Sequence, residues 1–237
     1  MARSRCCAGR FCLGAAMTLM PDIQSFAVAP PRQPTLRVAP TSGTRLFWRA
    51  KAVADIAAAV AMLPVIALVG AVLLVLNPVF NPGPLLFRQD RMGRGGAIFA
   101  VRKFRTMGCR ADPRGPLDPK EVDRIPRLGH ILRKTGLDEL PQAFNILRGE
   151  MSLIGPRPDC ARHARLFLET IPEYRQRLSV KPGMSGLAQV TQGYAVGLAA
   201  TRAKALADAD YIARANPRLE LWIIWRTIGM VLLARGD

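Results

Sequence analysis

The sequence predicts an α+β fold that is mostly helical, with one membrane helix and one β-hairpin. One apolar run is long enough to cross a bilayer, and two short apolar-aromatic segments flank a glycine-rich turn. Much of the remaining chain spaces its apolar residues as helices do. We divide the chain into a leader (1–44), a membrane helix (45–80) and a domain that carries the candidate site (81–237).

The leader differs in composition from the rest of the chain. Residues 1–44 contain five Arg but one acidic residue, Asp22, together with several prolines and no sustained periodicity. The apolar run after Arg10 and its cleavage site are poorly formed for a signal peptide. A disordered leader, or a start codon assigned too far upstream, fits this stretch better.

The membrane segment, residues 52–76, is apolar except for Asp55. About 20 apolar residues suffice to cross a bilayer, so a single transmembrane helix is one prediction. Pro64 lies in the middle, where it lacks a backbone donor and clashes with the carbonyl of Val60. Basic residues lie on both sides, and such flanks favour the cytoplasm. A re-entrant helix that bends at Pro64 and returns is an equally good prediction from these residues.

The elements after the membrane segment follow from period and turn residues. In chain order we expect a hairpin around Gly93–Gly96, a polar loop at 108–122, a short helix ending at Gly136, a helix with Leu140, Phe144 and Leu147 on one face, a turn at 151–159, one or two helices at 161–178, a loop with a short extended piece at 181–194, and a helix at 199–215. The final apolar run, Leu221–Leu233, is too short to span a bilayer and suits the membrane interface or a core helix.

The charge of the chain indicates an anionic partner. The net charge is +17, and 28 of the 34 basic residues are Arg, whose planar guanidinium binds phosphate in a bidentate manner. Nucleic acid, anionic lipid and a phosphorylated substrate all fit this charge. Nucleic acid is the weakest of the three, because aromatic residues make up 6% and no nucleic-acid-reading motif is present. The five Cys and two His show no metal-binding spacing.

Two adjacent carboxylates, Asp138 and Glu139, precede Pro141. The ordinary interpretation is a solvated helix start, with Asp138 as N-cap. The functional interpretation is an ionised Asp138 that attacks phosphorus, with Arg133 and Lys134 screening the charge of the phosphate. A divalent metal, Mg²⁺, held by Asp138 would help for the same reason. Glu139 would then act as a base or as an orienting group.

Other cations occur in positions that suit phosphate binding. Pro156 and Pro158 enclose Arg157 in a stiff turn, which presents the guanidinium at a small entropic cost. Lys103 and Arg105 are two residues apart, so we expect them on the same side of a strand. Lys181, before Pro182, is another cation on a rigid backbone. Each residue alone is more often an ordinary surface group, but together they favour a site for a multiply charged phosphate.

The motifs resemble those of the bacterial sugar transferase family, the small monotopic phosphoglycosyl transferases. The resemblance runs from about Arg45 to the C-terminus. It rests on NPGPLLFRQDRMGRGGAIFAVRKFRTM, RLGHILRKTGLDELPQAFNILRGEMSLIGPRP, KPGMSGLAQV and DADYIARANPRLELW. Several long motifs in the right order make a chance match very improbable.

The resemblance implies a re-entrant membrane helix, interfacial amphipathic helices and a small catalytic domain in the cytoplasm, at the bacterial inner membrane. It implies transfer of a sugar 1-phosphate from a UDP-sugar to a polyprenyl (undecaprenyl) phosphate with release of UMP, as the first step of exopolysaccharide, capsule or glycan assembly. The implied route is Mg²⁺-dependent and passes through an aspartyl phosphosugar. Asp138 would be the nucleophile with Glu139 as its partner. Arg133 would steady phosphate, and the turn Pro156–Pro158 would hold the uridine end.

The chain departs from the family pattern at three places. Leu63 stands before Pro64, where members often have Ser, and Thr191–Tyr194 replace an Asn-Gly-Arg sequence. The leader is too short for the extra transmembrane domain of larger relatives. The identity of the sugar and the oligomeric state, monomer or homo-oligomer, stay open. The alternative function is a non-catalytic membrane-anchored scaffold of polysaccharide assembly, which would bind UDP-sugar without turnover.

Overall fold

The computed structural model describes residues 44–108, 125–192 and 197–232. The expected leader, apart from Thr44, and the expected polar loop at 108–122, apart from Gly108, lie outside the described residues, as do residues 193 and 194.

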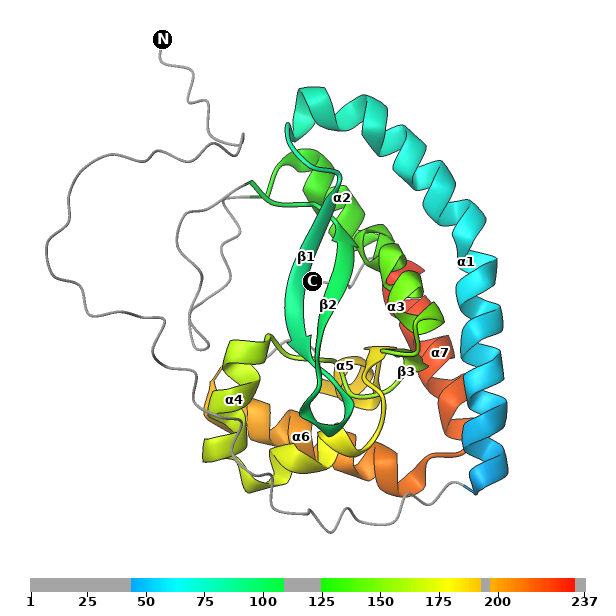
Figure 1. Ribbon diagram of the computed structural model, residues 1–237, viewed down its shortest axis with the longest axis vertical. Helices are drawn as coiled ribbons and strands as arrows, with labels where there is room; N and C mark the ends of the chain where they lie inside the picture. The colour runs from blue at the N-terminus through cyan, green and yellow to red at the C-terminus, as the bar shows by residue number, and fades with distance from the viewer. Residues whose placement is uncertain (1–43, 109–124, 193–196, 233–237) are drawn as a thin grey trace, which may run out of the picture. The chain divides into compact units, whose positions relative to one another are not determined.

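The membrane segment forms one helix, α1 (Arg45–Phe80), along one side of the described elements (Figure 1). Thr44 caps its start, because the Thr44 hydroxyl accepts a hydrogen bond from the backbone N–H of Phe47 at 3.2 Å. The helix is continuous through Pro64. Within the described residues it is the helix that is long and apolar enough to cross a membrane.

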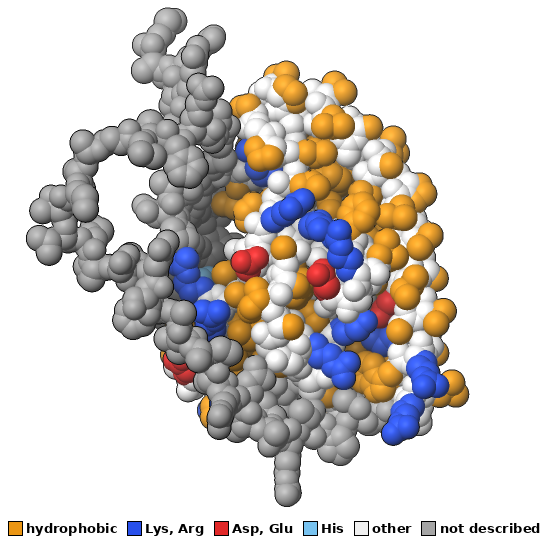
Figure 2. Space-filling model, viewed as in Figure 1, with side chains coloured by type: hydrophobic (Ala, Val, Ile, Leu, Met, Phe, Trp, Pro, Cys, Tyr) orange, Lys and Arg blue, Asp and Glu red, His pale blue; other side chains and the backbone are white. Residues whose placement is uncertain are grey.

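One face of α1 packs against the rest of the fold. Its buried residues recur every three, four or seven positions, at Asp55, Ala59, Ile66, Gly70, Leu73 and Asn77. This stripe contacts the elements that carry the candidate site, and it runs along two thirds of the helix. The other faces expose apolar side chains such as Val53, Leu68 and Val75, and Figure 2 shows apolar groups gathered along this edge.

The predicted hairpin is confirmed. Strands β1 (Leu86–Met92) and β2 (Ile98–Phe104) are antiparallel, with Leu86 opposite Phe104 and Met92 opposite Ile98. The short 3₁₀ turn η2 (Arg94–Gly96) joins them, and Gly95 adopts the left-handed φ of 66° that favours glycine. Val101 and Phe104 of β2 enter the core that also contains residues of α1.

The predicted short helix before the carboxylates is also confirmed. Helix α2 (Arg127–Lys134) stops just before Gly136, whose φ of 68° turns the chain into the 3₁₀ helix η4 (Leu137–Gln142). Helix α3 (Ala143–Leu147) follows directly.

The predicted helix with Leu140, Phe144 and Leu147 on one face is divided between η4 and α3, and Leu140 packs against the core. Phe144 and Leu147 are each 37% exposed, whereas Asn145 is fully buried. The Asn145 amide donates to the Ala100 carbonyl at 2.8 Å and accepts from the Arg102 N–H at 3.2 Å. Since Asn145 thereby satisfies the open edge of β2, the helix turns Asn145 inward and the two apolar side chains outward.

A second, parallel pair of strands was not predicted. Strand β3 (Ser152–Ile154) lies in the stretch expected to be a turn, and β4 (Gly183–Ser185) is the short extended piece expected in the loop at 181–194. They approach so closely that a Cβ on Gly183 would lie 2.2 Å from the backbone N of Gly155. Residues expected to continue the loop form helix α5 (Leu187–Gln192) instead.

The remaining helices agree with the predicted ones. They are α4 (Ala161–Thr170), the 3₁₀ helix η5 (Pro172–Ser179), α6 (Leu198–Arg214) and α7 (Pro217–Leu232). Helix α7 has two characters, because Ile223 is fully buried in the core while Trp225 is 73% exposed. The sequence left open whether this segment is a core helix or a membrane-interface helix. In the structure it contributes Ile223 to the core and also exposes apolar side chains, as an interface helix would.

Candidate active site

The two adjacent carboxylates lie in the first turn of η4, immediately after Gly136. The ordinary interpretation of Asp138 as an N-cap is wrong, because Gly136 holds the cap position and no side chain makes a capping hydrogen bond there. Asp138 is nevertheless 94% buried. A buried carboxylate that does not cap a helix needs another explanation.

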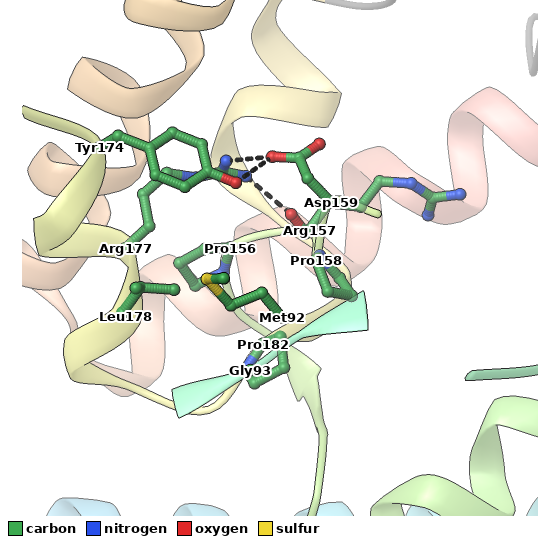
Figure 3. Close-up of a pocket in the computed structure, with 10 residues that line it drawn as sticks. All are labelled: Met92, Gly93, Pro156, Arg157, Pro158, Asp159, Tyr174, Arg177, Leu178 and Pro182. Atoms are coloured by element: carbon green, nitrogen blue, oxygen red, sulfur yellow. Dashed lines mark hydrogen bonds and ion pairs between the residues drawn. The ribbon is translucent and has the colours of Figure 1, made fainter. Parts of the chain in front are cut away.

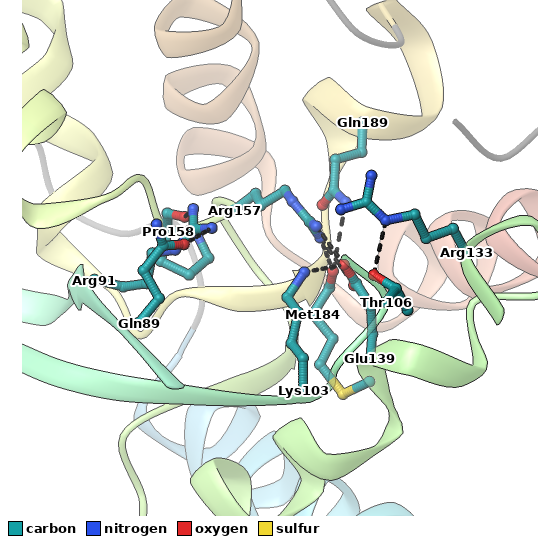
Figure 4. Close-up of polar contacts among 10 residues, drawn as sticks. All are labelled: Gln89, Arg91, Lys103, Thr106, Arg133, Glu139, Arg157, Pro158, Met184 and Gln189. Carbon is teal, nitrogen blue, oxygen red and sulfur yellow. Dashed lines mark hydrogen bonds and ion pairs between the residues drawn. The ribbon is translucent and has the colours of Figure 1, made fainter. Parts of the chain in front are cut away.

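Glu139 is held by two cations (Figure 4). The Lys103 ammonium lies 2.5 Å from Glu139 Oε1, and Arg157 Nη1 donates to Oε2 at 3.0 Å, while Arg157 Nη2 donates to Oε1. Burial alone would raise the pKa of Glu139, but Arg157 and Lys103 outweigh it and hold the pKa well below its usual range. Glu139 is therefore a permanent anion that joins strand β2 to the turn around Arg157.

Asp138 has a different environment. Among the described residues, no hydrogen-bond donor pairs with its carboxylate. Burial, and then the charge of Glu139, raise the pKa of Asp138 to about 6, against the opposing effect of Lys103, Arg133 and Arg157. At neutral pH the group is mostly ionised yet poorly solvated. Such an oxygen is suited to nucleophilic attack or to binding a metal.

The predicted cations divide into two groups. Lys103 and Arg157 converge on Glu139, and Arg133 lies next to them with its Nε donating to the Thr106 hydroxyl at 2.9 Å. Arg157 also donates to the backbone carbonyl of Met184 at 3.2 Å. The turn that holds Arg157 between Pro156 and Pro158 thus points its guanidinium at Glu139, and its role in phosphate binding stays a prediction.

Arg105 and Lys181 lie elsewhere. Lys103 and Arg105 have different partners, because the Lys103 ammonium pairs with Glu139 whereas Arg105 contacts the end of α1. The Arg105 guanidinium is buried and donates to the Asn81 carbonyl at the end of α1. The Lys181 ammonium lies beside Gly149, and a Cβ there would be 3.5 Å from it. A role for either residue in substrate binding stays a prediction.

The sequence did not identify Arg177, which supports the turn from behind (Figure 3). Its guanidinium pairs with Asp159 at 2.5 Å and with Asp208 at 2.6 Å, and donates to the Arg157 carbonyl at 2.7 Å. The Tyr174 hydroxyl donates to the same Asp159 oxygen at 2.7 Å. Arg177 is far from these partners in sequence, so no local pattern could have indicated the contact.

Asp55 connects α1 to the site. Its carboxylate accepts hydrogen bonds from the Ser152 hydroxyl at 2.7 Å and from the Leu153 N–H at 3.1 Å. Lys51 lies 3.6 Å from Asp55 and 2.5 Å from Glu220 of α7. The polar residue within the apolar run therefore fixes α1 to β3, the strand that leads into the turn at Pro156. The isolated acid in the apolar stretch was the sequence signal for this contact.

A Mg²⁺ ion fits the residues of the site only in part. The described residues contain no group of three or more His, Cys, Asp or Glu that could hold a metal alone. Asp138, however, offers a carboxylate that no described donor occupies. This suits Mg²⁺, which typically uses one or two carboxylates and fills its other positions with water and substrate phosphates.

Comparison with known proteins places this geometry in a family. Residues 46–234 match the model of a family described as "Bacterial sugar transferase". The chain is similar to the UDP-glucose:undecaprenyl-phosphate glucose-1-phosphate transferase of Caulobacter vibrioides, with 44% identity over 64% of this chain and 55% of that protein. It is 40% identical to the UDP-N-acetylgalactosamine-undecaprenyl-phosphate N-acetylgalactosaminephosphotransferase of Aeromonas hydrophila, over 77% of this chain and 43% of that protein.

A third relative has a more similar length. The exopolysaccharide production protein PSS of Rhizobium leguminosarum bv. phaseoli is 39% identical over 62% of this chain and 78% of that protein. The chain spans about half the length of the Caulobacter and Aeromonas relatives. Since the family match covers nearly all of the described residues, the carboxylate pair and the turn at Arg157 included, the chain belongs to the bacterial sugar transferase family.

Proposed function

We propose that this protein transfers a sugar 1-phosphate from a UDP-sugar to a polyprenyl phosphate, such as undecaprenyl phosphate, and releases UMP. The observation that carries the proposal is the contrast within the carboxylate pair. Glu139 is held by Lys103 and Arg157, whereas no described donor pairs with the neighbouring Asp138. The relatives named as undecaprenyl-phosphate sugar-phosphate transferases support the same reaction.

The reaction proceeds in two displacements at one phosphorus atom. A carboxylate oxygen of Asp138 attacks the sugar-bearing phosphorus of the UDP-sugar, and the bond from that phosphorus to the bridging oxygen breaks. UMP leaves with the electron pair of that bond. A phosphate oxygen of the polyprenyl phosphate then attacks the same phosphorus and breaks the bond to Asp138. This step restores the carboxylate and yields a polyprenyl diphosphate sugar.

Glu139 acts as an orienting group in this scheme. Because Arg157 and Lys103 keep its pKa well below the usual range, it does not take up a proton at neutral pH. Its role is to hold the two cations beside Asp138, where they offset the negative charge of the phosphates. The attack of one anion on another requires this preorganised positive charge.

Asp138 would also be the protein ligand of a Mg²⁺ ion. The bound ion would supply Lewis-acid stabilisation of negative charge on the phosphate oxygens. Arg133, beside the site, would steady the diphosphate, and the turn from Pro156 to Pro158 would hold the uridine end.

The packing of α1 supports a re-entrant arrangement in the membrane. The buried stripe from Asp55 to Asn77 keeps the domain along most of the helix, so a perpendicular crossing would draw polar groups of the domain into the hydrocarbon. We infer that α1 enters and leaves the inner membrane from the cytoplasmic face, with the domain in the cytoplasm. The open apolar side chains of α7, Trp225 among them, would lie at the interface.

UMP release tests the reaction. Purified protein in detergent with Mg²⁺, a polyprenyl phosphate and a panel of UDP-sugars should release UMP with at least one donor. Asp138→Asn should abolish the release, whereas Asp90→Asn, at an exposed position of β1, should retain it. Normal turnover by Asp138→Asn would rule out the assignment.

The covalent intermediate requires a separate measurement. Incubation with the active UDP-sugar but without lipid acceptor should add the mass of one phosphosugar to the peptide that contains Asp138. If the protein binds UDP-sugars yet releases no UMP with any donor, the scaffold function would be the better description.

A further inference from the structure

A small pocket lies between the hairpin and the turn at Arg157, next to the carboxylate pair. It is lined by Arg91, Val101, Lys103, Gln142, Arg157 and Pro158. Its volume of about 10 Å³ accommodates roughly one water-sized atom, and the pocket is open on one side. A larger group could therefore place a single atom in it while the rest of the group remains outside.

Two hydrogen-bond donors of this pocket have no partner within the described residues. They are Nε of Arg91 and Nε2 of Gln142, and both atoms are buried. The whole Gln142 side chain is deeply buried, with 2% exposure. The other nitrogens of Arg91 are occupied, because Nη1 donates to the Pro158 carbonyl at 2.8 Å and Nη2 donates to the Gln89 amide oxygen at 2.6 Å (Figure 4). Buried donors without partners are rare in native proteins, and a ligand that accepts their hydrogen bonds would remove the cost.

The charge of the pocket indicates the sign of that ligand. Three cations, Arg91, Lys103 and Arg157, line the pocket, and Glu139 is the carboxylate that pairs with two of them. Burial, and then repulsion from Arg157, lower the pKa of Arg91 against the opposing effect of Asp159, Cys160 and Glu139. A water molecule would satisfy the two donors, but three cations beside one paired carboxylate favour an anionic oxygen in this position.

We propose that this pocket receives one oxygen of a substrate phosphate group, which accepts hydrogen bonds from Arg91 Nε and Gln142 Nε2. The inference rests on the proposed function, since it assigns these two residues to the same reaction. Two substrates of the proposed reaction carry such an oxygen: the UDP-sugar in its diphosphate and the polyprenyl acceptor in its phosphate. Both must approach Asp138, and the pocket lies beside it.

The variant Gln142→Met separates a ligand-binding role from a structural one. Methionine keeps the length and approximate volume of glutamine but removes the unpartnered donor. If the Gln142 amide donates only to a bound ligand, Gln142→Met without ligand should unfold at the same temperature as the ligand-free wild type or at a higher one. If the amide stabilises the empty protein through a contact of its own, the midpoint of thermal unfolding should fall.

Binding measurements without turnover identify the source of the phosphate. Isothermal titration of the detergent-solubilised protein uses UDP as one probe and a short-chain polyprenyl phosphate as the other. Gln142→Met should weaken the binding of one probe by about tenfold or more, as expected for the loss of one hydrogen bond to a charged group, and leave the other unchanged. Arg91→Lys, which keeps the charge but not Nε, should weaken the same probe. Gln176→Met, at an exposed position of η5, is the control and should change neither affinity.

The outcomes are decisive in both directions. Weaker binding of one probe by both variants, measured at a temperature where each is folded, supports the subsite and names its ligand. Affinities within twofold of wild type for both probes would overturn it, and would mean that the pocket holds water. In that case the wild type would still release UMP, whereas a failure of the proposed function would appear as a wild type that releases none.

Discussion

Arg157 Nη1 lies 3.0 Å from Oε2 of Glu139, so a guanidinium from a proline-bounded turn grips a carboxylate that precedes it by 18 residues. Lys103 of strand β2 donates a second charged hydrogen bond to the same carboxylate. This contact separates the tasks of the two adjacent acids. Arg157 and Lys103 hold the pKa of Glu139 well below its usual range, whereas burial and Glu139 raise the pKa of Asp138 to about 6.

The first prediction concerns the pH dependence of the first chemical step. Burial and Glu139 raise the pKa of Asp138 to about 6, and the ionised form attacks in the proposed reaction, so kcat/KM for UMP release should rise with pH through about 6 and level off above it. Below that pKa the rate should fall by about tenfold for each pH unit. A rate that stays constant down to pH of about 4.5 would contradict the assignment, since an ordinary exposed aspartate would behave in that way.

The second prediction is that two neutralising variants move this pH profile in opposite directions. Glu139→Gln removes a neighbouring negative charge, so the apparent pKa of Asp138 should fall. Arg157→Gln removes a neighbouring positive charge, so the apparent pKa should rise. Both variants should also lower the maximal rate, because each breaks the ion pair that positions the cations. Arg88→Gln, at an exposed position of β1, is the matched control and should leave the midpoint unchanged. Equal shifts in one direction would indicate general damage to the site.

Features that local sequence determines could be predicted. The hairpin follows from two short apolar strands around glycines, and the stop of α2 follows from Gly136, whose left-handed φ a side chain disfavours. The turn at Arg157 follows from the two prolines that enclose it. Each of these signals lies within a few residues of the structure that it specifies.

Features that depend on distant partners could not be predicted. Arg91 was one of several basic residues after the membrane segment, and its contact with the Pro158 carbonyl joins residues 67 positions apart. Strands β3 and β4 have three residues each, too few for a periodic signal. The exposure of Phe144 and Leu147 could not be predicted, because the buried Asn145 determines how α3 is oriented and its partners lie on β2.

The third prediction concerns the polar anchor of α1. Asp55→Ala leaves the Ser152 hydroxyl and the Leu153 N–H without their acceptor and Lys51 without one of its two carboxylates. Loss of a buried, hydrogen-bonded carboxylate should lower the free energy of unfolding by about 2–4 kcal/mol. Ser152→Ala removes a single donor and should cost about 1 kcal/mol. Denaturant unfolding in detergent measures both, and equal effects of the two variants would show that Asp55 is not the centre of this contact.

The fourth prediction concerns the close approach of β3 and β4. Gly183→Ala would place a Cβ 2.2 Å from the backbone N of Gly155, and the backbone cannot move away without displacing the turn at Arg157. The variant should unfold at a markedly lower temperature and should lose UMP release even where it is folded. Gly229→Ala in α7 is the control, because nothing lies within 4 Å of the added carbon. This helix position should gain up to about 1 kcal/mol. A Gly183→Ala variant as stable and active as the wild type would contradict the observed strand spacing.

The last prediction concerns the side of the membrane on which the two ends of α1 lie. The domain contacts the buried stripe of α1 from Asp55 to Asn77, so both ends should remain on the side that holds the domain. Single cysteines at Ala50 and Asp90, introduced separately into a variant without native Cys, lie at exposed positions before and after the apolar run. In intact cells, both should resist a membrane-impermeant thiol reagent, and both should react after the inner membrane is permeabilised. Labelling of one position in intact cells and not of the other would show that α1 crosses the bilayer, and the packing of the domain along the helix would then have to open in the membrane.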